Sequence, residues 1–408
     1  MVAAFAVSII LGRTIGPEGL GIINLANRVV AIVLILALLG MNNVILKEIA
    51  IAYERKDWQH VANTIYTALR INVPLALVFS VVFIILTPWL TINFFSEPQL
   101  KIPLIIALAV LVSQVISRIF GSGINGFRKI WQSSLVDNTL SLVVVSVGLV
   151  LLLLLKIEIT AINVAILYAI GRVTVTFAVR TYWKHLFKFS GKRTPQTHTM
   201  LKVALPLLVV SATTMIASNA DTVMLGWLSN TREVGFYSVA VRLGLLTSFF
   251  HMLTTSSLTP KIAALHGQNK KAELQKMVQQ VTKGLGIVGL AGVIVFVLAG
   301  KYILNLWGNE FTVAYLPLVI ISVGQFFNIA TGATGIILIM TGHEKIVGYI
   351  STISLLANLI LNYLLIPEYG AIGAALATAF TISFSNILKV VLVYRKLNIN
   401  TLPSTRKR

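Results

Sequence analysis

Long apolar stretches separated by short polar segments fill almost the whole chain. A helix of about 20 apolar residues crosses a bilayer, and twelve stretches of this kind predict twelve transmembrane helices. They lie near residues 1–12, 20–42, 64–88, 102–125, 132–155, 160–183, 203–226, 234–258, 283–305, 313–340, 346–366 and 371–394. The stretches are continuously apolar and do not alternate, which favours helices over the strands of a membrane barrel. The first stretch is short, and we expect it to be an incomplete transmembrane helix.

The chain contains a repeat whose two copies lie 214 positions apart. "LGRTIGPEGLGIINLANR" at 11–28 and "LGWLSNTREVGFYSVAVR" at 225–242 share Leu, Gly, Ala and Arg at matching positions, and "NGFRKI" at 125–130 resembles "TGHEKI" at 341–346. Because this offset spans six predicted helices, the chain reads as two six-helix units with the same orientation in the membrane. The predicted organisation is a first bundle at 1–183, a basic linker at 184–202, a second bundle at 203–394 and a basic tail at 395–408.

The composition supports a membrane protein and excludes several kinds of chemistry. Hydrophobic residues make up 57% of the chain and charged residues 11%, which is too little polar surface for a soluble globule. Cysteine is absent, so disulfides and thiolate sites are excluded. "GSGING" and "GLGIVG" match a dinucleotide-binding pattern, but both lie in apolar helices, where close helix packing is the better interpretation. We therefore expect neither an enzyme nor an ATP-driven pump, and no cofactor or metal.

The placement of the basic residues predicts the topology. The net charge is +20, and 22 of the 33 Lys and Arg residues lie in alternate loops and the tail, whereas the opposite loops hold five. By the positive-inside rule, the number of spans is even and both termini and the linker lie in the cytoplasm. The charge therefore points to a membrane surface, and no nucleic-acid partner is expected.

Charged and polar side chains inside the predicted spans are the candidates for a binding site. A lipid-facing Arg at a helix centre costs at least ~2.5 kcal/mol, so Arg118 and Arg172 should face the protein interior or a wet cavity. Spacing places Gln114, Arg118 and Asn125 on one helical face. The candidate substrate-binding residues are Arg28, Arg70, Arg118, Arg172, Arg242, Gln114, Asn125, Asp137, Asn138, Asp221, Gln325, Asn328 and Asn358.

Structural roles compete with binding for several of these residues. Interhelical hydrogen bonds, which contribute about 0.6 kcal/mol on average in membranes, explain a single Ser or Asn equally well. Asp137 could pair with Arg118 or Arg70 instead of binding a ligand. Asp221 could cap the outer end of its helix.

Five segments together resemble a known family. They are "LGRTIGPEGLGIINLA", "LPLLVVSATTMIASNADTVMLG", "VGFYSVAVRL", "WGNEFTVAYLPL" and "NLILNYLLIPEYGAIGAALAT". With them, the chain resembles the oligosaccharide flippases of the multidrug/oligosaccharidyl-lipid/polysaccharide exporter superfamily. The resemblance implies a V-shaped pair of bundles with a central cavity. It also implies transfer of a polyprenyl-diphosphate-linked oligosaccharide across the bacterial inner membrane, with polysaccharide polymerase machinery as a partner.

The leading hypothesis is therefore a flippase that works by alternating access. Arg118 and Arg172 would offset the diphosphate charge, and the polar stripes would contact sugar hydroxyls. One alternative is a cation-coupled multidrug antiporter, which needs buried carboxylates, whereas the spans offer only Asp137 and Asp221. A non-transporting membrane scaffold is a third hypothesis. A membrane polymerase or transferase would need a catalytic external domain, and the predicted external loops are too short to form one.

Overall fold

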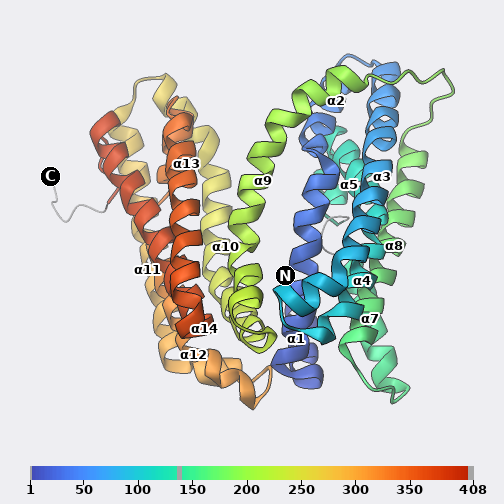
Figure 1. Ribbon diagram of the computed structural model, residues 1–408. Coiled ribbons are helices and arrows are strands. Elements are labelled where there is room, and N and C mark those ends of the chain that lie inside the picture. Colours follow the sequence, from blue (N-terminus) through green and yellow to red (C-terminus); the bar gives the residue numbers. More distant parts are fainter. Residues whose placement is uncertain (1, 136–139, 403–408) are drawn as a thin grey trace. The chain divides into compact units, whose positions relative to one another are not determined.

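The computed structural model describes residues 2–135 and 140–402, and all regular secondary structure in these ranges is helical (Figure 1). The elements of the first half are α1 (Val2–Leu38), α2 (Met41–Glu54), α3 (Trp58–Trp89), η1 (Leu90–Phe94), η2 (Pro98–Leu100), α4 (Lys101–Ala109), α5 (Leu111–Gly126), α6 (Ile130–Ser134), α7 (Leu140–Leu154) and α8 (Ala161–Leu186). Those of the second half are α9 (Thr197–Leu228), α10 (Thr231–Gly267), α11 (Lys271–Leu304), η4 (Asn309–Ala314), α12 (Tyr315–Ala330), α13 (Thr334–Met340) and α14 (Glu344–Leu397). The predicted all-α, multi-pass architecture is confirmed.

The helices match the twelve predicted spans once their breaks are considered. Among the described residues, eight helices are long and apolar enough to cross a membrane, and the pair α4 and α5, bent by 44°, makes a ninth span. α1 and α14 each contain two helical segments, which meet at Gly16 and Gly370, where φ is positive. The shorter apolar helix α7 lies in the predicted span 132–155. Each of the twelve predicted spans thus coincides with helical structure in the described part of the chain.

Large apolar side chains cover much of the surface of the helices. Phe177 and Leu298 are each 74% exposed, and many other Val, Leu and Ile side chains are more than half exposed. Exposing apolar area to water costs about 25 cal/mol per Å², and contiguous apolar surface on this scale is typical of a surface that faces lipid. These exposed faces support a chain that spans the membrane.

The repeat is visible in the positions at which helices break. α1 changes direction at Gly16 (φ 67°), and Pro17 then begins its second segment, where a missing N–H costs little. The equivalent position 214 residues later is Asn230, whose side chain accepts a hydrogen bond from the Glu233 N–H (3.0 Å) and caps α10. The two copies therefore begin a helix at equivalent positions. The first copy uses a glycine with positive φ followed by a proline, and the second uses a side-chain cap.

The copies differ one helix further along. In the first copy, Leu39 and Gly40 both have positive φ and separate α1 from α2, whereas α10 runs through the equivalent position without a break. A Cβ atom on Gly40 would lie 2.6 Å from the Leu208 backbone nitrogen and 2.7 Å from the Ala204 carbonyl oxygen, both on α9. Glycine at this break lets the α9 backbone approach closely.

The described contacts divide the chain into two compact units, Met1–Val223 and Met224–Arg408. α9 belongs to the first unit as far as Val223, and its Ser211 and Asn219 side chains accept hydrogen bonds from Asn43 on α2 and Arg28 on α1. α8 continues to Leu186, so the segment without helix between the halves is 187–196, shorter than the linker drawn from the sequence. The sequence-based bundle boundaries stay a prediction.

The core of the second unit includes the start of the basic tail. Ile399 is 2% exposed and joins an apolar cluster, and the Asn400 N–H donates to Gln275 Oε1 on α11 (3.1 Å). The other buried members of this cluster are Leu258, Ile262, Leu274, Val278, Ala333, Ile337, Leu338 and Val393. The tail therefore packs on the helices as far as these residues.

Candidate functional site

Two arginines connect helices inside the first unit. Arg172 on α8 donates from Nη2 to Asn27 Oδ1 on α1 (2.6 Å). Arg28, the next residue on α1, donates from Nη1 to Asn219 Oδ1 on α9 (2.8 Å), and Asn219 is 1% exposed. These bonds link α8 to α1 and α1 to α9 through charged side chains.

Arg172 lies near the middle of a membrane-spanning helix. It is 11 residues after Ala161, the first residue of α8, and 14 before Leu186, the last. At 1.5 Å per residue, these separations correspond to about 16 Å and about 21 Å. Arg28 also lies 11 residues after the start of its helical segment at Pro17, and this shared level agrees with the bond between Arg172 and Asn27. A charge at this depth requires polar surroundings.

α5 completes the polar surroundings of Arg172. Arg118 on α5 is close enough to Arg172 for the two positive charges to interact, and Tyr168 on α8 is also within electrostatic range of Arg172. The two helices are joined by the Ser113 hydroxyl, which donates to Thr176 Oγ1 (2.9 Å), and by the Thr176 hydroxyl, which donates to the Ser113 carbonyl oxygen (2.7 Å). The structure thus places Arg118 within electrostatic range of Arg172, and their role as a substrate site stays a prediction.

Three buried hydrogen-bond donors in this region have no acceptor among the described residues. They are Asn24 Nδ2 on α1, Gln114 Nε2 on α5 and Arg172 Nη1 on α8. Leaving a buried donor unpaired costs roughly 1–3 kcal/mol, so such groups almost always have a partner. Unpaired donors on the three helices that carry Arg28, Arg118 and Arg172 favour a guest that supplies acceptors and negative charge.

We call this group the α1–α5–α8 site. Its members are Asn24, Asn27, Arg28, Gln114, Arg118 and Arg172. Asn24, Asn27 and Arg28 fall at i, i+3 and i+4, on one face of α1. Sequence analysis selected the arginines and Gln114 but missed Asn24 and Asn27, although this spacing could have revealed them. It also missed Asn219, which follows Ser218 in a polar stretch of α9.

Other candidates from the first half lie elsewhere or are not described. Arg70 is exposed and lines a separate pocket with Arg180 and Lys184. Asn125 lies at the end of α5, seven residues beyond Arg118. Asp221 follows Asn219 by two residues on α9 and is partly buried. Asp137 and Asn138 lie outside the described residues.

The second unit arranges its polar candidates differently. Gln325 Oε1 accepts hydrogen bonds from the Ser248 hydroxyl and from Asn328 Nδ2 (3.1 Å for the latter). Asn328 Oδ1 in turn accepts from Asn386 Nδ2 (3.2 Å), so α10, α12 and α14 are joined by one network. None of these four side chains is among the buried groups left without a partner in the described part of the chain. The side chains of this network therefore serve as hydrogen-bond partners for one another.

The remaining two candidates lie on α14 and α10. Asn358 Oδ1 accepts from Asn362 Nδ2 (3.1 Å), a contact within α14 between two buried side chains. Arg242 is partly buried on α10 and, like Arg28, lies 11 residues after the first residue of its helix.

Comparison with known proteins relates the chain to polysaccharide biosynthesis proteins. The family described as "Polysaccharide biosynthesis protein" matches residues 1–266, and the MatE family matches residues 206–364. The capsular polysaccharide biosynthesis protein CapF of Staphylococcus aureus is 26% identical over 57% of this chain and 59% of its own length. The probable flippase AglR of Haloferax volcanii is 32% identical over 42% of this chain and 36% of its own. The chain thus covers less than two thirds of either relative.

Solved structures share the fold over almost the entire chain. An inward-facing multidrug-resistance transporter of the MATE family and MOP superfamily has a TM-score of 0.77, with 97% of this chain and 94% of that chain covered. The lipid II flippase MurJ has a TM-score of 0.71, with 96% and 86% covered. Each is 15% identical in sequence. The likeness establishes a shared fold.

Proposed function

Because this chain belongs to the polysaccharide biosynthesis protein family, we propose that it is a flippase for polyprenyl-diphosphate-linked oligosaccharide. It moves the headgroup from the inner to the outer leaflet of a bacterial inner membrane during polysaccharide assembly. The observation that carries the proposal is the α1–α5–α8 site, whose three helices hold two deep arginines within electrostatic range of each other and three buried donors that have no acceptor among the described residues. In this proposal the chain is a transporter and catalyses no covalent step.

The chemistry of the site suits a diphosphate. A guanidinium presents parallel N–H groups that grip phosphate oxygens at two points, and such charged hydrogen bonds are stronger than neutral ones. Arg118 and Arg172 would hold the diphosphate, and Arg172 Nη1 is free to donate. Asn24 and Gln114 would donate to phosphate or sugar oxygens. The polyprenyl chain would stay in the lipid.

A depth of about 16 Å from one helix end fits a guest that must cross the bilayer. At this depth, a polar headgroup finds hydrogen-bond donors where the membrane itself offers none. Alternating exposure of the site to the two sides of the membrane would complete the transfer. The polysaccharide polymerase machinery would then receive the product at the outer face.

The MatE match favours a second candidate, a cation-coupled multidrug antiporter. The charge of the α1–α5–α8 site argues against it, because two adjacent arginines repel a cationic drug and attract an anionic headgroup. The two candidates therefore differ in the sign of the substrate's charge.

Deletion of the gene distinguishes these candidates. The flippase proposal expects the lipid-linked oligosaccharide to accumulate on the inner leaflet, with no gain in sensitivity to cationic drugs. The position of the sugar is measured by its accessibility to a membrane-impermeant glycan-modifying reagent in right-side-out and inverted vesicles. Normal surface polysaccharide together with drug sensitivity would establish the antiporter instead. If the deletion caused neither phenotype, the scaffold hypothesis would be the one that remains.

The direction of transfer depends on the topology, which we propose from the distribution of basic residues. Both termini and the segment 184–202 lie in the cytoplasm. A reporter that is active only in the periplasm should be silent when it is fused after Arg408 and active when it is inserted near Asn309. The opposite result would reverse the orientation.

A further inference from the structure

A pocket of about 620 Å³ lies in the first unit, apart from the α1–α5–α8 site. It is formed by α3, α5 and α8 together with the connection 187–196. Four of its lining residues are cations, Arg70, Arg180, Lys184 and Arg193, and none is acidic. The others are the apolar or aromatic residues Ala62, Ile65, Tyr66, Leu69, Val73, Pro74, Ile116, Phe120, Trp183, Phe187 and Phe189.

The aromatic wall of the pocket is closely packed. The Trp183 ring stacks on Phe127, with centroids 5.3 Å apart and planes 17° apart, and Phe187 lies 5.5 Å from Trp183. A Cβ atom on Gly123 would lie 2.8 Å from the Trp183 ring, so the glycine lets α5 and α8 meet at this point. Tyr66 and Trp183, which line the pocket, are of the two residue types that gather at the boundary between membrane and water, where lipid headgroups lie.

The cations at the rim have no side-chain partner in the part of the chain that the structure describes. All four are exposed, and none forms an ion pair or side-chain hydrogen bond with a described residue. Four like charges around one opening repel each other, and an anion between them would relieve the repulsion. The opening thus selects for negative charge.

Hydrogen bonds hold the connection 187–196 against α3. The Asn63 amide donates to Thr194 Oγ1 (2.9 Å) and accepts from the Thr194 N–H (2.8 Å), while the Gln196 N–H donates to Thr67 Oγ1 (3.0 Å). Gln59 donates to the Lys192 carbonyl oxygen (2.7 Å). The pocket residues Phe187, Phe189 and Arg193, which lie on this connection, are thereby held in place before any ligand arrives.

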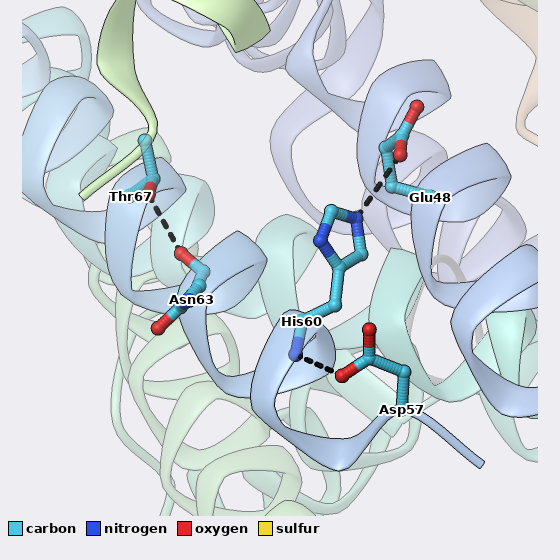
Figure 2. Close-up of polar contacts among 5 residues, drawn as sticks. All are labelled: Glu48, Asp57, His60, Asn63 and Thr67. Carbon is cyan, nitrogen blue, oxygen red and sulfur yellow. Dashed lines mark hydrogen bonds and ion pairs between the residues drawn. The ribbon is translucent and has the colours of Figure 1, made fainter. Parts of the chain in front are cut away.

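The start of α3 is itself fixed. Figure 2 shows Asp57 accepting from the His60 N–H (2.9 Å) as an N-cap, and the His60 ring against Glu48 on α2 (3.1 Å). The same view shows Thr67 donating to the Asn63 carbonyl oxygen one turn away (2.6 Å). These contacts hold the side chains that bind the connection.

We propose that this pocket binds an anionic phospholipid of the membrane leaflet beside it. The phosphate lies among Arg70, Arg180, Lys184 and Arg193, and the first part of an acyl chain follows the apolar wall toward Pro74. The four uncompensated cations select an anionic lipid over a zwitterionic one, and the long apolar wall selects a lipid over a soluble phosphate. The site uses none of the residues of the α1–α5–α8 site.

Native mass spectrometry of the detergent-solubilised full chain tests this proposal by titration with dioleoylphosphatidylglycerol. We expect the double variant Arg180→Ala/Lys184→Ala to bind this lipid at least tenfold more weakly than the unsubstituted chain. The matched control Lys271→Ala/Lys276→Ala removes two exposed lysines of the second unit and should bind normally. Dioleoylphosphatidylcholine should bind weakly to all three proteins.

Each contrary result overturns the proposal. Equal binding by the rim variant and the control would show that the cations do not hold the lipid. Equal binding of the two lipids would remove the charge selectivity. Displacement of the lipid by millimolar inorganic phosphate would identify a site for soluble anions.

If the double variant does not fold, Arg193→Glu is measured instead, since it lies in the non-helical connection. Unchanged lipid binding by Arg193→Glu would likewise reject the proposal. All these outcomes leave the flippase proposal untouched, because Arg118 and Arg172 are unaltered.

Discussion

The two halves of this chain place polar residues at the same repeat positions but surround them differently. Gln114 on α5 and Asn328 on α12 lie 214 positions apart, the offset of the repeat. The Asn328 amide donates to Gln325 and accepts from Asn386, whereas Gln114 Nε2 is buried without an acceptor in the described part of the chain. A buried amide is a structural group when its neighbours satisfy it and a candidate binding group when they do not.

The charges differ between the halves in the same way. Arg28, Arg172 and Arg242 each lie 11 residues after the first residue of a helical segment, at Pro17, Ala161 and Thr231. The second segment of α14 begins at Ala371, and the residue 11 positions further along is Ile382. The first unit therefore has two arginines at this level and the second has one. The two units therefore share a helix framework and differ in the charges that it carries.

The largest effect is expected from removing the arginines of the α1–α5–α8 site. Arg118→Ala and Arg172→Ala should each lower flipping about a hundredfold, because a charged hydrogen bond contributes roughly 1.5–3 kcal/mol. Flipping of the lipid-linked oligosaccharide is measured in reconstituted vesicles, with the amount of inserted protein quantified. Arg232→Ala, which removes an exposed arginine that faces Glu310 at 3.6 Å, serves as the control. Full activity of both Ala variants at normal abundance would make the arginines structural and the proposed site wrong.

The next largest effect is expected where the helix paths of the two copies differ. Gly40→Ala should destabilise the protein by about 2–3 kcal/mol, because an L-residue at positive φ costs about 1–2 kcal/mol and its Cβ meets the α9 backbone. Thr254→Ala, at the equivalent position inside the continuous α10, should change stability by no more than about 0.5 kcal/mol. Denaturant unfolding in detergent measures both variants. Equal effects would mean that the break between α1 and α2 is not required for packing.

A smaller effect should follow when the charge is kept and the geometry is changed. Arg172→Lys should lower flipping about tenfold, which is ~1.4 kcal/mol, because an ammonium offers one point charge where the guanidinium offers two parallel donors. The same vesicle assay applies, and Arg172→Ala provides the lower limit. Activity equal to that of the unsubstituted protein would show that charge alone is sufficient at this position.

The smallest effect tests the two amides directly. Asn328→Leu should destabilise the protein by about 1 kcal/mol because it breaks a satisfied buried network. Gln114→Leu should be neutral or stabilising, since it removes a buried donor that has no acceptor. Thermal unfolding in detergent compares the two, and destabilisation by Gln114→Leu of the same size would contradict the proposed difference between the halves.

Much of the architecture follows from local sequence patterns. The helix breaks at Gly16 and Asn230 lie where the repeat places short turns, because Gly, Pro and Asn carry the preference for a turn or a cap in their own backbone and side chain. Apolar runs of bilayer length identify spans without any knowledge of their neighbours. The break after Leu38 has no such signal, since it depends on how closely the α9 backbone approaches Gly40.

The residues of the site were only partly predictable for a similar reason. The cost of burying a charge depends on membrane depth, which the sequence reveals, so Arg118 and Arg172 were identified as interior residues. Whether a neutral side chain has a partner depends on helices far apart in the chain, so Asn24 and Asn27 were overlooked. The sequence predicts the same binding role for Gln325 and Asn328, although in the structure the Asn328 amide donates to Gln325.

By itself, the sequence determined that this chain crosses a membrane as a helical protein, that its framework is duplicated, and that arginines lie deep within its spans. These properties arise from composition, spacing and the cost of placing charge in lipid, all of which act within one helix. Only the tertiary structure decided which amides are satisfied, that Arg172 bonds to Asn27, and that Arg70 lines a separate pocket. Hydrogen bonds between distant segments require the helices to be packed, because a donor at one position finds its acceptor more than a hundred residues away.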